Sequence, residues 1–239
     1  MAEMIIFNGV GLETVAPVKI EDILVSPVEL SVTARDRPVS AGADFVRIKS
    51  GTRTVTVSFG LPTQNRELRA AQLQAIASWA YSQREGELSL PDRQGVVLRC
   101  ICTALPEPSA RQWWEDKLKL VFTAFSDPYW ISTDEKSAAC GTALFVLGSA
   151  PPAMRITRTL SAAVSNQSYS DGTDTMTFST IPAGDLEIDL DRQTAAVTAN
   201  NTTASIMQYY TFGSHFPIPK TGAQTITGTG TVKWRERWI

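Results

Sequence analysis

The chain has 239 residues, and its 22 lysines and arginines nearly balance its 24 aspartates and glutamates, which gives a formal net charge of −2 at pH 7. This length predicts one or two domains that bury a core without disulfides, and the charge balance argues against a dedicated DNA-binding protein. The single histidine, His215, excludes histidine-rich metal sites and limits acid–base catalysis.

Secretion and membrane insertion are not indicated. The apolar run 4–7 is too short for a signal-peptide core, and no stretch approaches the roughly 18 apolar residues of a membrane span. Of the three cysteines, Cys100 and Cys102 lie on one face of a predicted strand, where a bridge between them is poorly shaped. We therefore expect a soluble protein with reduced thiols, folded in the cytoplasm.

The first half of the chain is predicted to consist mostly of short β-strands. Apolar and polar residues alternate over 54–59, 97–102 and 117–122, the pattern of a half-buried strand. Turn-forming residues at 50–51 and 91–95 are suited to join such strands into hairpins.

One segment, 66–82, has helical periodicity instead. Asn65 is placed to cap its start, and Gly86 follows its end. Its apolar residues recur at three- and four-residue spacing, namely Leu68, Ala71, Ala75, Ile76, Trp79 and Ala80. An amphipathic helix with this stripe turned to the sheet makes the first half an α+β unit.

A boundary motif, Asp127-Pro128-Tyr129-Trp130, follows the strand predicted over 117–125. Proline removes a backbone donor and restrains the preceding residue, so the strand should end here. The two large amphipathic rings are expected to pack across a domain seam. We predict domains at 1–132 and 133–239, with Asp127, Pro128, Tyr129 and Trp130 as a structural junction that contacts no ligand.

The second half is predicted to be all β, with a spacing of strands that suits a β-sandwich. The expected strands are 143–148, 154–160, 175–181, 186–190, 194–198, 206–212, 224–227 and 231–239. The fold class is therefore mainly β.

Four carboxylates on one face of a predicted strand raise the question of a calcium site: Asp185, Glu187, Asp189 and Asp191. An EF-hand loop counted from Asp185 needs glycine at its sixth position and glutamate at its twelfth, where this chain has Leu190 and Ala196. A solvated face that protects a sheet edge is favoured.

Two aromatic and cationic segments invite functional readings. Trp113-Trp114 resembles a sugar platform, but neighbouring residues on a strand face opposite ways, so packing or a subunit contact is favoured. In the last strand, Lys233, Arg235 and Arg237 share one face, which favours a solvent or subunit surface over nucleic acid.

The remaining candidates carry little chemistry. His215 has no acid or second ligand nearby in sequence, and 228–230 is too short for a dinucleotide fingerprint. Glycosylation acceptors at Asn166, Asn200 and Asn201 are chance matches without a secretion route. We predict no catalytic residue, no metal and no cofactor, and the sequence names no ligand-binding residue.

The order of these features resembles the distal tail proteins of long, non-contractile-tailed bacteriophages. The resemblance covers nearly the whole chain, although 33–42 stands where the family has a Gly-Arg-X-Gly signature. It is carried by the opening 5–9, the strand 53–61 leading into the helix 66–82, the strand 88–90 with the Asp92 turn, the boundary motif, the hairpin at 186–189, and the segment 216–222.

This resemblance implies a non-enzymatic virion protein at the tail tip. It implies an N-terminal belt domain that forms a homo-oligomeric ring of six subunits, and a peripheral galectin-like β-sandwich. The ring would join the tail tube protein to the tail-associated hub protein, and DNA would pass through without specific binding. The sandwich would carry receptor-binding proteins or contact host glycans.

A second hypothesis is a carbohydrate-binding module that attaches the particle to the host surface. It requires exposed, coplanar aromatic rings in the sandwich, with Tyr209, Tyr210, Trp234 and Trp238 as the candidates.

Overall fold

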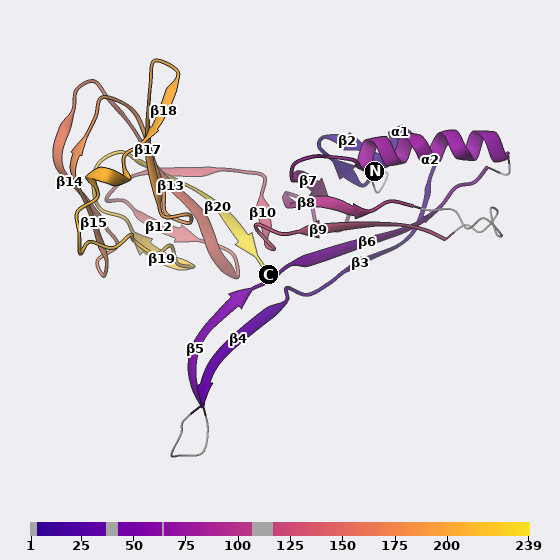
Figure 1. The fold of residues 1–239 in the computed structure, drawn as a ribbon, viewed down its shortest axis with the longest axis horizontal. Coiled ribbons are helices and arrows are strands. Elements are labelled where there is room, and N and C mark those ends of the chain that lie inside the picture. The colour runs from indigo at the N-terminus through magenta and orange to yellow at the C-terminus, as the bar shows by residue number, and fades with distance from the viewer. Residues whose placement is uncertain (1–3, 37–42, 64, 107–116) are drawn as a thin grey trace. The chain divides into compact units, whose positions relative to one another are not determined.

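A computed structural model describes residues 4–36, 43–63, 65–106 and 117–239. Strands dominate its regular structure, which confirms the predicted mainly β class (Figure 1). The chain forms two compact units, the first comprising Met1–Trp130 with Ile239 and the second Ile131–Trp238.

The first unit is built on antiparallel strands in the order β3-β6-β9-β8-β7-β1-β2. These are β1 (Ile6–Phe7), β2 (Val10–Gly11), β3 (Lys19–Val25), β6 (Arg53–Gly60), β7 (Gly86–Ser89), β8 (Val96–Ala104) and β9 (Leu118–Ala124). The predicted alternation is confirmed, because Val55, Val57 and Phe59 are buried while the residues between them are half-buried. β6 and β9 therefore form the centre of this unit's core.

Two strands of the first unit form a separate ribbon, which we call the arm. β4 (Leu30–Asp36) and β5 (Ala43–Ser50) pair with each other and with no other strand among the described residues. The arm continues from β3 and returns into β6 (Figure 1). The hairpin predicted at 50–51 is wrong: β5 pairs with β4 and β6 with β3, so this segment connects the arm to the sheet without joining a strand pair.

The predicted helix is α2 (Arg66–Ala80), and a short α1 (Leu12–Val15) precedes it in the chain. The Asn65 cap is confirmed, since its side-chain oxygen accepts the N–H groups of Glu67 and Leu68 at 2.9 and 3.1 Å. The C-terminal half of α2 packs on the core through Trp79, whose ring centroid lies 5.9 Å from that of Phe7.

The predicted buried stripe of α2 is partly wrong. Ile76 and Ala80 are buried as expected, but Leu68 is 51% exposed and Arg69 is buried in its place. The buried face of the helix contains residues 69, 76 and 80. Their spacing is as compatible with one helix face as the spacing of the predicted apolar residues. Burying Arg69 is a tertiary outcome that residue polarity argues against.

The second unit contains a sheet in the order β18-β17-β16-β13-β20, with β11 on the other edge of β20, and two separate strand pairs, β12-β19 and β14-β15. The strands are β11 (Lys136–Ala139), β12 (Ala143–Val146), β13 (Ala150–Leu160), β14 (Val164–Ser170), β15 (Thr175–Ile181), β16 (Gly184–Asp189), β17 (Thr194–Ala199), β18 (Thr202–Ser205), β19 (Gly222–Thr225) and β20 (Thr231–Trp238). One hydrophobic core joins side chains of the large sheet with those of both pairs, as in a β-sandwich. The strand β10 (Trp130–Ser132) spans the point where one unit ends and the next begins.

The predicted strand 206–212 is wrong. This segment is a 3-10 turn, Met207–Tyr209, and Tyr210 then packs its ring on Phe178 and Phe216. Aromatic packing holds this segment in place instead of the hydrogen bonds of a β-strand pair. Conversely, β11, β14 and β18 escaped prediction because their sequences are mostly polar or small. Strand β13 begins earlier than predicted, through two prolines at a bulge, where proline is tolerated.

Candidate functional site

The boundary motif packs within the first unit. Asp127, Pro128 and Trp130 are buried, and Tyr129 is half-buried. The Tyr129 hydroxyl hydrogen-bonds the Ser50 hydroxyl at 2.6 Å, while the Tyr129 N–H donates to the Asp127 carboxylate at 3.3 Å. The motif is thus fastened to the end of the arm.

Two arginines flank this motif. The guanidinium of Arg93 lies over the Trp130 ring, with its carbon 4.7 Å from the ring centroid, in cation–π contact. Arg53 is only 3% exposed. Burial and the nearby positive charge of Arg93 lower the pKa of Arg53, against an opposing effect of Tyr129. We call Arg53, Arg93 and Trp130 the arginine–tryptophan cluster.

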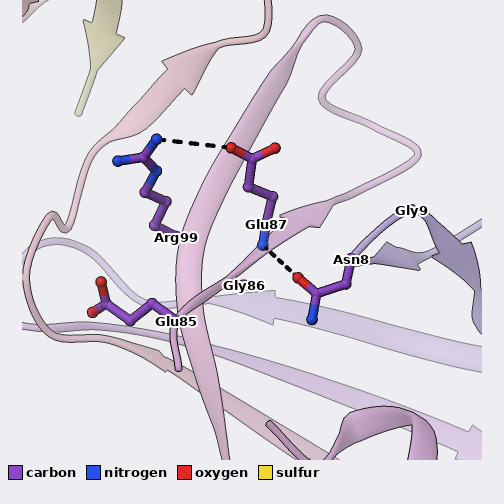
Figure 2. A pocket seen from close by; sticks show the side chains of 6 residues that line it. All are labelled: Asn8, Gly9, Glu85, Gly86, Glu87 and Arg99. Carbon is purple, nitrogen blue, oxygen red and sulfur yellow. Dashed lines mark hydrogen bonds and ion pairs between the residues drawn. The ribbon is translucent and has the colours of Figure 1, made fainter. Parts of the chain in front are cut away.

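A polar pocket of about 460 Å³ lies elsewhere in the first unit, where the β1–β2 turn meets β7 (Figure 2). Its lining residues are Asn8, Gly9, Glu85, Gly86, Glu87 and Arg99. The Asn8 side-chain oxygen accepts the Glu87 N–H at 3.2 Å, and Glu87 reaches Arg99 at 3.9 Å. The Glu85 carboxylate accepts both the N–H and the hydroxyl of Ser126.

Polar and charged groups line this pocket. Its carboxylates already have partners: Glu85 holds the loop after β9 through Ser126, and Glu87 pairs with Arg99 across β7 and β8. No group of three or more potential metal-ligating side chains occurs among the described residues. Sequence reasoning missed this pocket, because nothing in residues 8–9 or 85–87 marks them as neighbours.

The four carboxylates have separate partners, and only three of them lie on β16, because Asp191 belongs to the turn that follows the strand. The Thr159 hydroxyl donates to Asp185 at 2.7 Å, and Arg155 bridges Glu187 and Glu135. Asp189 accepts the N–H groups of the turn that follows it. None of the four belongs to a group of three or more potential metal ligands among the described residues.

The expectation that Arg237 lies on a solvent or subunit face is wrong. Arg237 is buried and donates to both oxygens of Asp191, at 2.9 and 2.8 Å. Its neighbour Glu236 is buried as well, and its carboxylate accepts from Lys136 Nζ at 2.7 Å and from the Leu147 N–H at 2.9 Å. Both charges are buried because each has a partner of opposite sign. Lys233 and Arg235 are half-buried.

The other sequence candidates are dispersed. His215 is exposed, and its N–H donates to Thr175 at 2.9 Å. Gly228 and Gly230 have positive φ angles, as the predicted turn requires. The three cysteines are free thiols, and burial raises the pKa of each. Trp113-Trp114 lies outside the described residues.

The aromatic candidates for glycan binding do not form an exposed platform. Trp234 is buried, and Tyr210 lies between Phe178 and Phe216 in stacked and edge contacts. Tyr209 and Trp238 are half-buried.

No described helix is long and apolar enough to cross a membrane.

No family model and no curated protein matches the sequence. Among solved structures, the crystal structure of the SPP1 Dit protein, described as a paradigm of the hub adsorption apparatus in phages that infect Gram-positive bacteria, matches with a TM-score of 0.76 at 13% identity, covering 100% of both chains. The chain has the fold of a phage distal tail protein. The likeness expected from the order of the sequence features is thus confirmed for the fold.

Two further structures show the phage P2 baseplate in its activated conformation. The form with Ca matches with a TM-score of 0.47 at 10% identity, and the form with Sr with 0.46 at 9%. Each match covers 93% of this chain and 91% of the other.

Proposed function

We propose that this chain is a structural virion protein at the distal end of a phage tail. In this role it forms a ring of six copies, which joins the tail tube protein to the tail-associated hub protein. The observation that carries the proposal is the likeness to SPP1 Dit over the whole length of both chains. The protein would fold in the bacterial cytoplasm and act in the virion tail tip, with DNA passing through the ring without specific binding.

The arm supports self-association. An isolated two-stranded ribbon is marginally stable in water. Yet the arm exposes large apolar side chains, with Leu30 and Val32 each 61% exposed. Covering them with a second copy would stabilise the ribbon by removing apolar surface from water.

The edge of the sheet offers a second contact surface. Strand β3 pairs only with β6 among the described strands, so its other edge has backbone N–H and C=O groups available to a neighbour. Leu24 on this strand is 64% exposed. An arm and an edge are different surfaces, and a closed ring requires that each subunit use one surface against a different one of the next.

The proposed domain roles follow from these surfaces. The N-terminal domain, placed at 1–132 from the sequence, would form the ring because both contact surfaces belong to it. The C-terminal domain at 133–239 would carry receptor-binding proteins. The motif Asp127, Pro128, Tyr129 and Trp130 would serve as the structural junction.

The test is the mass of the protein in solution. Light scattering coupled to gel filtration, together with negative-stain microscopy, should show rings of about six subunits at high protein concentration, as the family resemblance implies. Val32→Glu should reduce the assembly to monomers because it places a charge in the contact. Phe145→Glu is the matched control, since Phe145 is an exposed strand residue of the second unit. A strictly monomeric wild type at high concentration would reject the proposal.

A further inference from the structure

The arginine–tryptophan cluster contains hydrogen-bond donors without acceptors. Four buried nitrogens have no hydrogen-bond partner among the described residues: Nε and Nη1 of Arg53, Nε of Arg93 and Nε1 of Trp130. Both Arg53 and Trp130 are more than nine-tenths buried. Buried donors are almost always paired in folded proteins, so four in one cluster indicate a missing acceptor.

These donors lie close to one another in the fold. Arg93 lies 4.7 Å above the Trp130 ring, and Arg53 is close enough to Arg93 and Tyr129 for their charges to affect it. The Tyr129 hydroxyl is hydrogen-bonded to Ser50, three residues before Arg53. The motif and the start of β6 therefore hold the two guanidinium groups together.

The charges select the kind of ligand. A water molecule could accept from these donors but supplies no negative charge to offset the buried Arg53 and the half-buried Arg93, and burial of unpaired charge is costly. A carboxylate or phosphate supplies several acceptor oxygens together with negative charge, which is the chemistry that guanidinium groups bind best. The carboxylate of the boundary motif, Asp127, accepts the Tyr129 N–H, and Glu85 accepts from Ser126.

We propose that Arg53, Arg93 and Trp130 form an oxyanion-binding site for a carboxylate or phosphate group, so that Trp130 contacts a ligand where the sequence predicted none. The group has two sources: a free inorganic anion, or an acidic side chain of a neighbouring protein chain in the assembly. Only the second source rests on the proposed ring function. In either case the bound anion cancels the repulsion between the two arginines and stabilises the boundary motif.

The first experiment measures thermal unfolding and calorimetric binding during titration with inorganic phosphate at constant ionic strength. At ten times Kd, phosphate should raise the Tm of the wild type by about 3 °C. Arg93→Gln should abolish this rise, and Trp130→Phe, which keeps an aromatic ring but removes the indole N–H, should reduce it. Arg99→Gln is the control, because Arg99 is a half-exposed arginine of the same unit that pairs with Glu87. The readout is the phosphate-induced shift, so a lower starting Tm does not affect it.

The second experiment measures self-association by sedimentation without added phosphate. If the anion is a neighbour's carboxylate, Arg93→Gln and Trp130→Phe should weaken association at least about tenfold, while Arg99→Gln leaves it unchanged. A phosphate shift that is lost in Arg93→Gln identifies the free anion, and loss of association alone identifies the neighbour. The site is rejected if the phosphate-induced Tm shift is the same in the wild type and all variants and no variant weakens association. This holds even if the protein forms rings. A monomeric wild type that still shows the Arg93-dependent shift would reject the ring and retain the site.

Discussion

Arg237 donates to both carboxylate oxygens of Asp191, at 2.9 and 2.8 Å, and thereby joins the last strand of the second unit to the turn after β16. The guanidinium is buried, whereas the carboxylate is partly exposed. Asp191→Ala should therefore lower the free energy of unfolding by about 1 to 2 kcal/mol, because it leaves a buried cation with fewer partners. Chemical denaturation measures this loss. Asp185→Ala, which removes an exposed carboxylate of β16, should cost about 0.5 kcal/mol or less, and equal losses would contradict the ranking.

Gly86 and Asn8 are packed too closely for a larger residue at position 86. A Cβ on Gly86 would lie 2.2 Å from the Asn8 side-chain oxygen, which is itself bonded to the Glu87 N–H. Gly86→Ala should thus destabilise the first unit by about 1 to 3 kcal/mol.

The origin of that cost can be checked in a double mutant. Asn8 has a φ of 51°, a conformation that glycine adopts readily, so Asn8→Gly removes the clashing side chain without straining the backbone. Gly86→Ala should cost clearly less in the Asn8→Gly background. Additive losses in thermal or denaturant unfolding would show that the side-chain clash is not the cause.

The contribution of Asp171 to the stability of the fold should be lost in acid. Burial alone would raise its pKa, but the N–H groups of Asp174 and Thr173 and the charge of Lys220 outweigh it, and the pKa is lowered. A carboxyl with a lower pKa in the folded state stabilises the protein above its unfolded pKa of about 3.9, and this contribution disappears as the pH falls through the folded value. The stability difference between wild type and Asp171→Asn should be full at pH 6 and should shrink below about pH 4. A difference that stays constant down to pH 2 would refute the assignment.

Trp130 is almost fully buried against Arg93 in the boundary motif. Trp130→Ala should lower stability by roughly 3 to 5 kcal/mol, because it creates a large cavity in the first unit. The matched comparison is Phe125→Ala, five residues earlier, where the ring is 55% exposed and the loss should be small. An unchanged melting temperature in Trp130→Ala would contradict the packing described here.

Local patterns in the sequence predicted the main helix and the central strands of both units. The alternation at 54–59 and the Asn65 cap depend on interactions within a few residues, and both were confirmed. The prediction for 206–212 was wrong because its aromatic residues serve side-chain packing and not a strand. Tyr210, for example, stacks its ring on that of Phe216. Polar strands such as β14 carry no such signal.

The sequence by itself determined the mainly β class, the main helix and the order of features that resembles distal tail proteins. The tertiary structure alone decided which charged residues are buried. Arg53, Arg69, Glu236 and Arg237 all read as surface residues in a linear sequence, and each is buried in the fold. The physical reason is that a charge is buried according to its neighbours in space. The partner of Arg237 lies 46 residues away and that of Glu236 lies 100 residues away, so no local periodicity records them.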